Sequence, residues 1–314
     1  MNSNDKIAIL TGPTATGKTS LALELARSAP VEIINADSML VYREMDIGTA
    51  KPSVREREAV PHHLIDIRNP DEPFTAGDFV RSAHAAIDDI QSRGKRPLLV
   101  GGTGFYLKAL LYGLWDAPRG DSALRARLES LTDQALFERL STISAATAGR
   151  IGKNDRYRLI RSIEIFELTG KTPEALQAQA SPAPDPRFEL WVLDRPQEEL
   201  MKRIHLRTRE MMAHGLVDEV ESIQRKFPES RALKAVGYAQ VVDHLTGTPP
   251  RGRKIPPGLD GVISEIELAT RQLVKRQRTW FKGRPEARWF LLDQDQEALK
   301  QAFAAVYLAP SYPT

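Results

Sequence analysis

The segment GPTATGKT at residues 12–19 constrains the fold most, because it has the form G-x-x-x-x-G-K-T and follows the apolar run Ile7–Leu10. Its glycines let backbone N–H groups converge on phosphate oxygens, and the helix that follows points its positive end at them. Lys18 is expected to reach the terminal phosphate, and the Thr19 hydroxyl to bind Mg²⁺ or a phosphate oxygen. The segment predicts a strand, a phosphate-binding loop and a helix, and it leaves the reaction open.

Short apolar runs elsewhere predict the rest of a parallel sheet. We expect strands at Ile7–Leu10, Val31–Ile34, Leu64–Ile67, Leu98–Val100, Leu190–Leu193 and Trp289–Leu292. Apolar residues at helical spacing in Thr19–Arg27 and Phe79–Ile90 indicate helices between these strands. This alternation predicts an α/β protein with a P-loop NTPase-like three-layer core.

Residues 115–186 interrupt the alternation. They carry helical patterns without a clear strand, and they end in the proline-rich ASPAPDPRF, which we interpret as a linker. We therefore expect an all-helical insertion domain at residues 115–186. The core would consist of residues 1–114 and 187–314, and its last third would be mostly helical.

Composition and local patterns exclude several classes of protein. The absence of Cys excludes a disulfide framework, a thiolate zinc site and a cysteine nucleophile. No apolar run approaches the ~20 residues of a membrane span, and the polar start predicts no signal peptide. We expect a cytoplasmic protein with no membrane partner. We treat His62 and His63 as non-ligands, because adjacent side chains point apart in a strand or helix.

Two polar positions should lie beside the phosphate loop, because open α/β sheets bind ligands at the carboxyl ends of their strands. Asp37 follows the second expected strand. It can act as a general base, bind Mg²⁺ through water or shape a turn. Thr103 follows Gly101 and Gly102 at the end of another strand. That strand lacks the Asp that often organises Mg²⁺ in P-loop kinases and ATPases, which disfavours an ordinary nucleotide hydrolase.

Arg203 and Arg207 are four residues apart and share one helical face. An arginine that reached the phosphate loop would neutralise charge developing on a leaving phosphate. Spacing alone favours the other reading, an exposed basic face.

The strongest basic segment runs from Arg271 to Arg284 without an acidic residue. Four of its cations form one helical stripe, namely Arg271, Lys275, Arg278 and Lys282. Cations at this spacing match repeated backbone phosphates, and Trp280 and Phe281 offer flat faces for bases. Residues 150–161 form a second basic cluster. Two separated clusters favour a large anion such as a nucleic acid.

With these residues established, the chain resembles the bacterial tRNA dimethylallyltransferases, also called tRNA isopentenyltransferases. The matching motifs run in family order from residue 12 to residue 283: GPTATGKT, ADSMLVYREMDIGTAKP, PHHLID, LLVGGTGFYLKAL, NDRYRLIRSIEIFELTGK, AVGYAQ and TRQLVKRQRTWFKG. The resemblance implies transfer of a dimethylallyl group from dimethylallyl diphosphate to the exocyclic amine of the adenosine 3′-adjacent to the tRNA anticodon. It also implies that Mg²⁺ assists.

Matched position by position, the resemblance implies a role for each motif. The diphosphate would be held by Gly12, Pro13, Thr14, Ala15, Thr16, Gly17, Lys18 and Thr19. The catalytic residues would be Asp37, Thr19, Lys18 and Arg207, with Mg²⁺ on Thr19 and on Asp37 through water. The tRNA contacts would be Asp37, Ser38, Met39, Leu40, Thr103, Arg125, Tyr157, Arg158, Leu159, Ile160, Arg161, Lys234, Ala235, Val236, Gly237, Tyr238, Ala239, Lys275, Arg276, Gln277, Arg278, Thr279, Trp280, Phe281 and Lys282. The insertion domain would grip the anticodon stem-loop of a tRNA bound by a monomer.

The chain departs from the family pattern at two positions, and three other functions stay open. Many members have Gln in place of Leu40 and Gly in place of Glu44, and Leu40 cannot hydrogen-bond a base. The alternatives are a P-loop small-molecule or nucleotide kinase, an adenylate dimethylallyltransferase, and a non-enzymatic RNA-binding protein. Whether ATP also binds the loop is left open by the sequence.

Overall fold

The structure is a computed structural model that describes residues 6–114, 118, 120–178, 183–248, 256 and 258–308. The chain forms two compact units, one from residues 1–111 and 184–314 and one from residues 112–183. The expected domain boundary at residue 115 and part of the expected linker, residues 180–182, lie outside the described residues.

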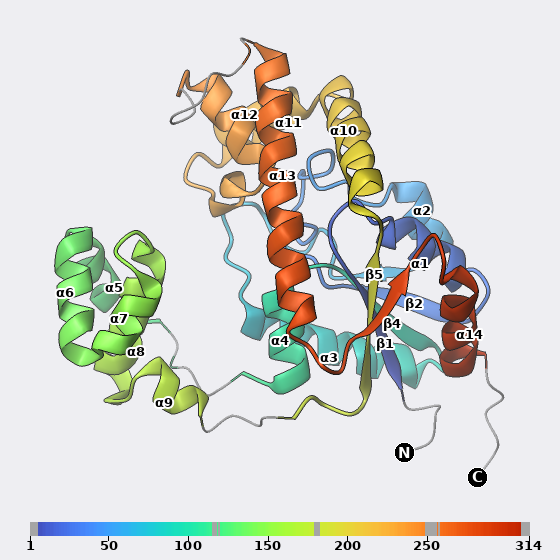
Figure 1. The fold of residues 1–314 in the computed structure, drawn as a ribbon, viewed down its shortest axis with the longest axis horizontal. Coiled ribbons are helices and arrows are strands. Elements are labelled where there is room, and N and C mark those ends of the chain that lie inside the picture. Colours follow the sequence, from blue (N-terminus) through green and yellow to red (C-terminus); the bar gives the residue numbers. More distant parts are fainter. Residues whose placement is uncertain are drawn as a thin grey trace. The chain divides into compact units, whose positions relative to one another are not determined.

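The larger unit is built on a parallel six-stranded sheet (Figure 1), which confirms the predicted α/β class. Its strands are β1 (Ile7–Thr11), β2 (Val31–Asn35), β3 (His62–His63), β4 (Arg96–Val100), β5 (Phe188–Asp194) and β6 (Arg288–Leu291). Their order is β3-β2-β4-β1-β5-β6, so β1 is central, and its Leu10 aligns with Val100 of β4 and Trp191 of β5. The phosphate loop therefore leaves the middle of the sheet at its carboxyl edge.

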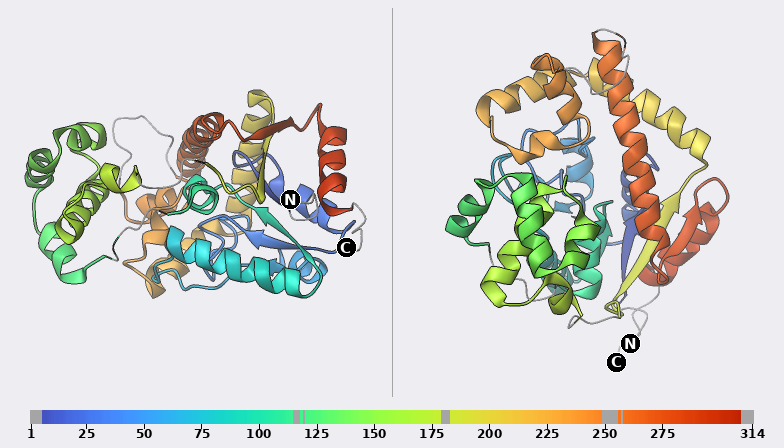
Figure 2. Two further views of the ribbon diagram at one scale, coloured as in Figure 1. Left: turned by 90° about the horizontal axis from the view of Figure 1, so that it is seen from below. Right: turned by 60° about the vertical axis from the view of Figure 1, so that its left-hand side comes forward.

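Helices cover both faces of this sheet (Figure 2). Strand β1 is buried along its whole length, as a strand between two helical layers must be. Ala8 and Leu10 belong to one core cluster, together with Leu25 of α1 and Phe303 of α14. Alternate residues such as Ile9 point to the opposite face. The covering helices are α1 (Lys18–Ala26), α3 (Ala76–Ser92), α4 (Gly104–Tyr112) and α14 (Gln296–Tyr307).

The strand expected at Leu64–Ile67 is wrong. The strand at this edge is β3, two residues earlier, and Leu64 and Asp66 adopt positive φ angles of 63° and 56°. Side chains hold this turn, because Asn35 Nδ2 donates to the Leu64 carbonyl over 2.9 Å and Lys51 and Arg57 both pair with Asp66. Local polar contacts outweigh the apolar run.

A second helical layer lies beyond the carboxyl edge of the sheet. It contains α10 (Gln197–Ala213), α11 (Leu216–Lys226), the 3-10 helix η2 (Arg231–Lys234), α12 (Tyr238–Leu245) and α13 (Leu259–Lys282). The short helix α2 (Val54–Ala59) lies beside α1 instead (Figure 1). The core between α10, α11, α12 and α13 includes Met211, Val220, Tyr238 and Ile266, and Met45 from the segment after β2 joins it.

The smaller unit is helical in all its described elements. These are α5 (Ser122–Glu129), α6 (Asp133–Ile143), α7 (Ala145–Ile151), α8 (Arg156–Thr169) and α9 (Pro173–Gln177). Its core joins Leu128, Leu136 and Leu140 to Leu159 and Ile163 of α8. In neither unit do the described helices offer the length and apolar content that a bilayer span requires.

Candidate active site between the phosphate loop and helix α13

The phosphate loop closes tightly on the sheet. Gly12 has a φ of 137°, and a Cβ there would lie 2.1 Å from the Leu193 carbonyl oxygen, so only glycine fits. Gly17 has a φ of 95° and stands just before the first residue of α1, where free backbone N–H groups face the loop. The Lys18 amine donates to the carbonyls of Gly12 and Pro13 over 2.9 and 2.8 Å. The loop thus has the backbone geometry of an anion cradle.

Burial controls the charge of Lys18. It lowers the pKa of the amine to about 8, the negative charge of Asp37 opposes this shift, and Arg207 adds to it. A lysine in this state gains its full charge when an anion enters the loop.

Helix α10 directs two arginines at the same loop. Arg203 Nε donates to the Ala15 carbonyl over 2.7 Å, and Arg207 Nη2 donates to Thr14 Oγ1 over 3.1 Å. Burial lowers the pKa of Arg207. The exposed basic face favoured by spacing is therefore wrong for these two residues.

Asp37 lies two residues beyond the end of β2, in a turn held by hydrogen bonds from neighbouring residues. The Asn35 side chain accepts from the Asp37 amide over 2.8 Å, and Asp37 Oδ1 accepts from the Met39 amide over 2.9 Å. Thr103 Oγ1 accepts from the Ser38 amide over 2.9 Å, which joins this turn to the end of β4. Oδ2 of Asp37 takes part in none of the hydrogen bonds found among the described residues, so this oxygen is available to a ligand.

Two cavities meet at Asp37. The first, of about 460 Å³, is lined by the phosphate loop, Lys18, Thr19 and Leu40. The second, of about 660 Å³, is lined by Thr103, Phe105, the segment Lys234–Tyr238 and one face of α13. Both cavities include Thr14, Asp37, Thr49 and Arg207 in their walls. A carboxylate and an arginine thus stand where a ligand in one cavity would face a ligand in the other.

Gln277 connects α13 to the phosphate loop, a role that sequence reasoning missed. Its Oε1 accepts from the Thr14 amide over 2.9 Å, and its Nε2 donates to the Gly102 carbonyl over 3.0 Å. Gly104 lets α13 approach, because a Cβ there would lie 2.8 Å from Trp280 Cδ2. Position 277 lies on the apolar face of the helix, but its partners lie 175 and 263 residues away, so no local pattern could identify them.

Most of the residues expected to contact tRNA line the second cavity. They are Asp37, Ser38, Met39, Thr103, Lys234, Ala235, Val236, Gly237, Tyr238, Arg276, Gln277, Trp280 and Phe281. Leu40 lines the first cavity instead. Tyr238 and Phe281 belong to the core, with side chains 1% and 0% exposed, so they form cavity floor and offer no free aromatic face.

The basic stripe on α13 lies on another face of the helix. Arg271, Lys275, Arg278 and Lys282 line a groove of about 520 Å³ next to the first turns of α10. All four side chains were expected to be free to bind phosphates, but Arg278 is not. It pairs with Asp194 over 2.8 Å and donates to the Arg195 carbonyl over 2.7 Å. Asp194 lies at the end of β5, far from Arg278 in the sequence, so the sequence pattern alone could not predict this ion pair.

In the smaller unit, two of the expected RNA-contacting arginines converge on a buried carboxylate. Arg125 and Arg161 pair with Glu164 over 2.8 and 2.5 Å, and the Glu164 side chain is fully buried. Burial raises the pKa of Glu164, but the hydrogen bonds and positive charges of the two arginines together outweigh burial, so the pKa is lowered overall. Leu159 and Ile160 are core residues at 0% and 5% exposure, so their side chains face the interior of this unit. Tyr157 and Arg158 are exposed at the start of α8.

Comparison with known proteins places this geometry in a family. The family model described as IPP transferase matches residues 40–284. The tRNA dimethylallyltransferase of Syntrophobacter fumaroxidans is 45% identical over 291 residues, which cover 90% of this chain and 83% of that protein. The tRNA dimethylallyltransferase 1 of Trichlorobacter lovleyi is 41% identical and covers 96% of this chain and 99% of its own.

Solved structures agree. The tRNA isopentenylpyrophosphate transferase of Bacillus halodurans aligns with a TM-score of 0.69 at 35% identity and covers 96% of each chain. A eukaryotic dimethylallyltransferase acting on tRNA aligns with a TM-score of 0.78 at 27% identity and covers 95% of this chain and 77% of its own. The chain therefore belongs to the IPP transferase family.

Proposed function

We propose that this chain transfers the dimethylallyl group of dimethylallyl diphosphate to the exocyclic amine of the adenosine 3′-adjacent to a tRNA anticodon and releases diphosphate. The observation that carries the proposal is the meeting of two cavities at Asp37, one rich in phosphate-binding groups and the other bordered by α13. The names of the relatives, tRNA dimethylallyltransferases, support the same donor and acceptor.

On the donor side, the residues of the first cavity stabilise a leaving group. Breaking the allylic carbon–oxygen bond leaves a carbocation-like fragment and a growing negative charge on diphosphate. The loop amides, Lys18 and Arg207 are arranged around the position of that charge, where preorganised donors have their largest effect.

The residues at the loop fit one magnesium ion. Mg²⁺ in phosphate sites usually takes one or two protein oxygens, substrate phosphates and waters. Thr19 and Asp37 line the same cavity, so the Thr19 hydroxyl would bind the ion directly and Asp37 would bind it through water. When bound there, the ion would neutralise part of the charge on diphosphate.

On the acceptor side, Asp37 would take the proton of the adenosine amine. That amine is a poor nucleophile because its lone pair is delocalised into the purine, so proton removal must accompany bond formation. The second cavity borders Asp37 and has room for a base that has left its stack. An unpaired base in the anticodon loop makes that displacement easiest.

The remaining basic groups would hold the rest of the tRNA. Residues 112–183 would act as the insertion domain that grips the anticodon stem-loop, through the basic Arg125, Arg158 and Arg161 and the aromatic Tyr157. In the larger unit, Lys275 and Lys282 are exposed on α13 and suited to backbone phosphates.

One experiment separates this function from its alternatives. The protein is incubated with Mg²⁺, unmodified tRNA and dimethylallyl diphosphate labelled separately in the prenyl chain and in the diphosphate. We expect prenyl label on the anticodon-loop adenosine and one free diphosphate for each adenosine modified. Parallel reactions contain AMP as acceptor or labelled ATP as donor. Prenylated AMP in place of prenylated tRNA, or phosphate transferred from ATP, would contradict the proposal.

A further inference from the structure

Three consecutive backbone N–H groups converge on one carboxylate away from the phosphate loop. The amides of Asp46 and Ile47 donate to Glu219 Oε2 over 2.9 and 2.7 Å, and the Gly48 amide donates to Oε1 over 3.1 Å. The Tyr238 hydroxyl donates to Oε1 over 2.6 Å. Successive amides in this arrangement form an anion-binding nest. Here the anion is a side chain of the protein itself, delivered by α11.

Gly48 allows the nest to close. A Cβ at this position would lie 2.5 Å from Cε2 of Tyr238, whose side chain is 1% exposed and cannot move aside. The segment after Met45 is thus seated against a core aromatic ring at the same point where Glu219 binds its backbone.

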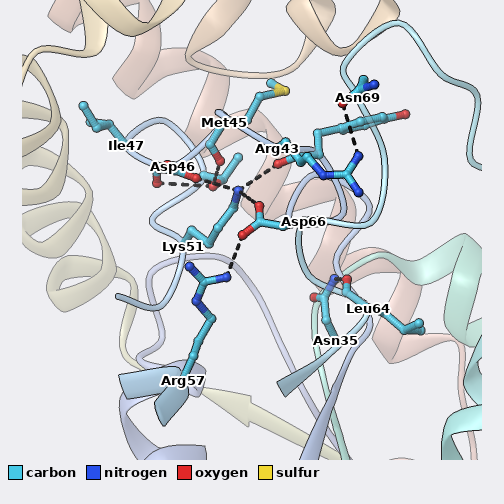
Figure 3. Close-up of polar contacts among 12 residues, drawn as sticks. Asn35, Arg43, Met45, Asp46, Ile47, Lys51, Arg57, Leu64, Asp66 and Asn69 are labelled. Carbon is cyan, nitrogen blue, oxygen red and sulfur yellow. Dashed lines mark hydrogen bonds and ion pairs between the residues drawn. The ribbon is translucent and has the colours of Figure 1, made fainter. Parts of the chain in front are cut away.

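A buried cation holds the next residues of the chain. The Lys51 amine donates to the Tyr42 carbonyl over 2.7 Å and pairs with Asp46 and Asp66 over 2.6 and 2.5 Å, and its side chain is 2% exposed. Arg57 closes the cluster on Asp66. Figure 3 shows the Lys51 amine between the two carboxylates, with Arg57 paired to the other oxygen of Asp66. Residues 46–51 are therefore fixed by Glu219 at one end and by Lys51 at the other.

This fixed segment forms part of the wall that the two cavities share, through Thr49. Thr49 lines both cavities, Gly48 lines the second, and Ala50 and Lys51 line the first. Asp37 belongs to the same two walls. A displacement of residues 46–49 would therefore change the space in which donor and acceptor meet without touching the phosphate loop.

We propose that Glu219 is a positioning residue for the transfer reaction: its carboxylate holds the backbone of residues 46–48 so that the shared wall keeps donor and acceptor in line with Asp37. The inference rests on the proposed function, because it needs two substrates that meet at this wall. Misplacement of reacting groups by about 1 Å can lower a rate by about 10²-fold. The effect should therefore fall on the transfer step and leave tRNA binding unchanged.

The test compares Glu219→Ala and Glu219→Gln with the matched control Glu221→Ala. Glu221 lies on the same helix, but its side chain is 58% exposed and its ion pair with Arg225 spans 4.0 Å. The measurements are the single-turnover transfer rate at saturating dimethylallyl diphosphate and tRNA, the tRNA affinity, the melting temperature, and amide hydrogen exchange in residues 46–48.

We expect Glu219→Ala to lower the transfer rate by about 10²-fold and to speed exchange at residues 46–48, with unchanged tRNA affinity. Glu219→Gln keeps one oxygen acceptor but presents an NH₂ group to the other donors, so its loss should be about tenfold. Glu221→Ala should match the wild type in all four measurements.

A Glu219→Gln protein with a wild-type transfer rate would overturn the inference, and this holds even if Glu219→Ala does not fold. If a Glu219 variant showed faster amide hydrogen exchange at residues 46–48 but an unchanged transfer rate, Glu219 would contribute to stability alone. A wild-type protein that transfers no prenyl group would contradict the proposed function instead. In that case the exchange comparison would still report whether Glu219 holds residues 46–48.

Discussion

Arg207 Nη2 donates a hydrogen bond to Thr14 Oγ1 over 3.1 Å, and this bond brings a side chain from the middle of α10 onto the phosphate loop. The two residues are 193 positions apart and both line the two cavities that meet at Asp37. The arginine is therefore placed to pair with an anion bound in the loop. Through this hydrogen bond, a helix of the second helical layer contributes directly to the phosphate-binding loop.

Replacing Lys18 or Thr19 by Ala should abolish prenyl transfer and leave tRNA affinity largely intact. Both residues line the donor cavity and neither lines the acceptor cavity. Transfer is measured with labelled dimethylallyl diphosphate, and affinity by filter binding, on variants whose melting temperature confirms folding. Equal loss of transfer and of tRNA affinity in a folded variant would mean that the two sites are wrongly assigned.

The affinity for inorganic diphosphate should fall as the pH rises through about 8, the value to which burial lowers the pKa of Lys18. Below that pH the amine is charged and attracts the anion, and above it the amine is neutral. Because diphosphate also titrates, calorimetry on the wild type is compared with Lys18→Ala, which should bind weakly and lack this decline. The same pH dependence in both proteins would exclude Lys18 as its source.

The low pKa of Lys18 also affects folding. The unfolded amine, with its usual pKa of 10.5, binds more protons than the folded one between about pH 8 and pH 10.5. The contribution of Lys18 to the free energy of unfolding therefore rises with pH across this window. The energetic cost of burying a charged lysine is fully present below pH 8, which is the pattern of a residue kept for binding an anion.

The basic stripe on α13 should separate into two kinds of residue. Replacing Lys275 and Lys282 together by Ala should weaken tRNA binding and lower its salt dependence by up to about two phosphate contacts. Arg278→Ala should leave that slope unchanged and lower the melting temperature, because it leaves the partly buried Asp194 without its partner. Filter-binding salt titrations and thermal unfolding measure the two effects. An unchanged slope in the double lysine variant would make the stripe an ordinary exposed face.

The sheet was largely predictable from the sequence because its strands are buried on both faces. Five of the six expected strands are confirmed with ends that differ by one or two residues, since continuous apolar runs mark such strands. The sixth, at Leu64–Ile67, fails because Asn35, Lys51 and Arg57 impose a turn there. None of these partners is visible in the pattern of the run itself.

The sequence predicted the backbone of the phosphate loop, but it did not predict which charged side chains are paired and which are free. The spacing of GPTATGKT fixes the backbone of a phosphate cradle by local rules. Whether an arginine can bind a ligand depends instead on partners that are distant in the sequence. Arg207 reaches Thr14 in the phosphate loop, whereas Arg278 is neutralised by Asp194. Glu219 and Gln277 act on backbone groups 171 or more residues away, so neither residue could be assigned a role from its surroundings in the sequence.

The single-turnover transfer rate of Asp37→Asn, measured beside its tRNA affinity and melting temperature, tests the central claim that donor and acceptor meet at this carboxylate. Asn keeps the shape of Asp37, and its side-chain oxygen can still accept the hydrogen bond from the Met39 amide, but it cannot take a proton near neutral pH. We predict a fall of roughly 10²–10⁴-fold with little change in tRNA affinity or melting temperature. Recovery of most of the rate at high Mg²⁺ would make Asp37 a metal-organising residue. A variant with near wild-type turnover at saturating substrates would contradict the claim.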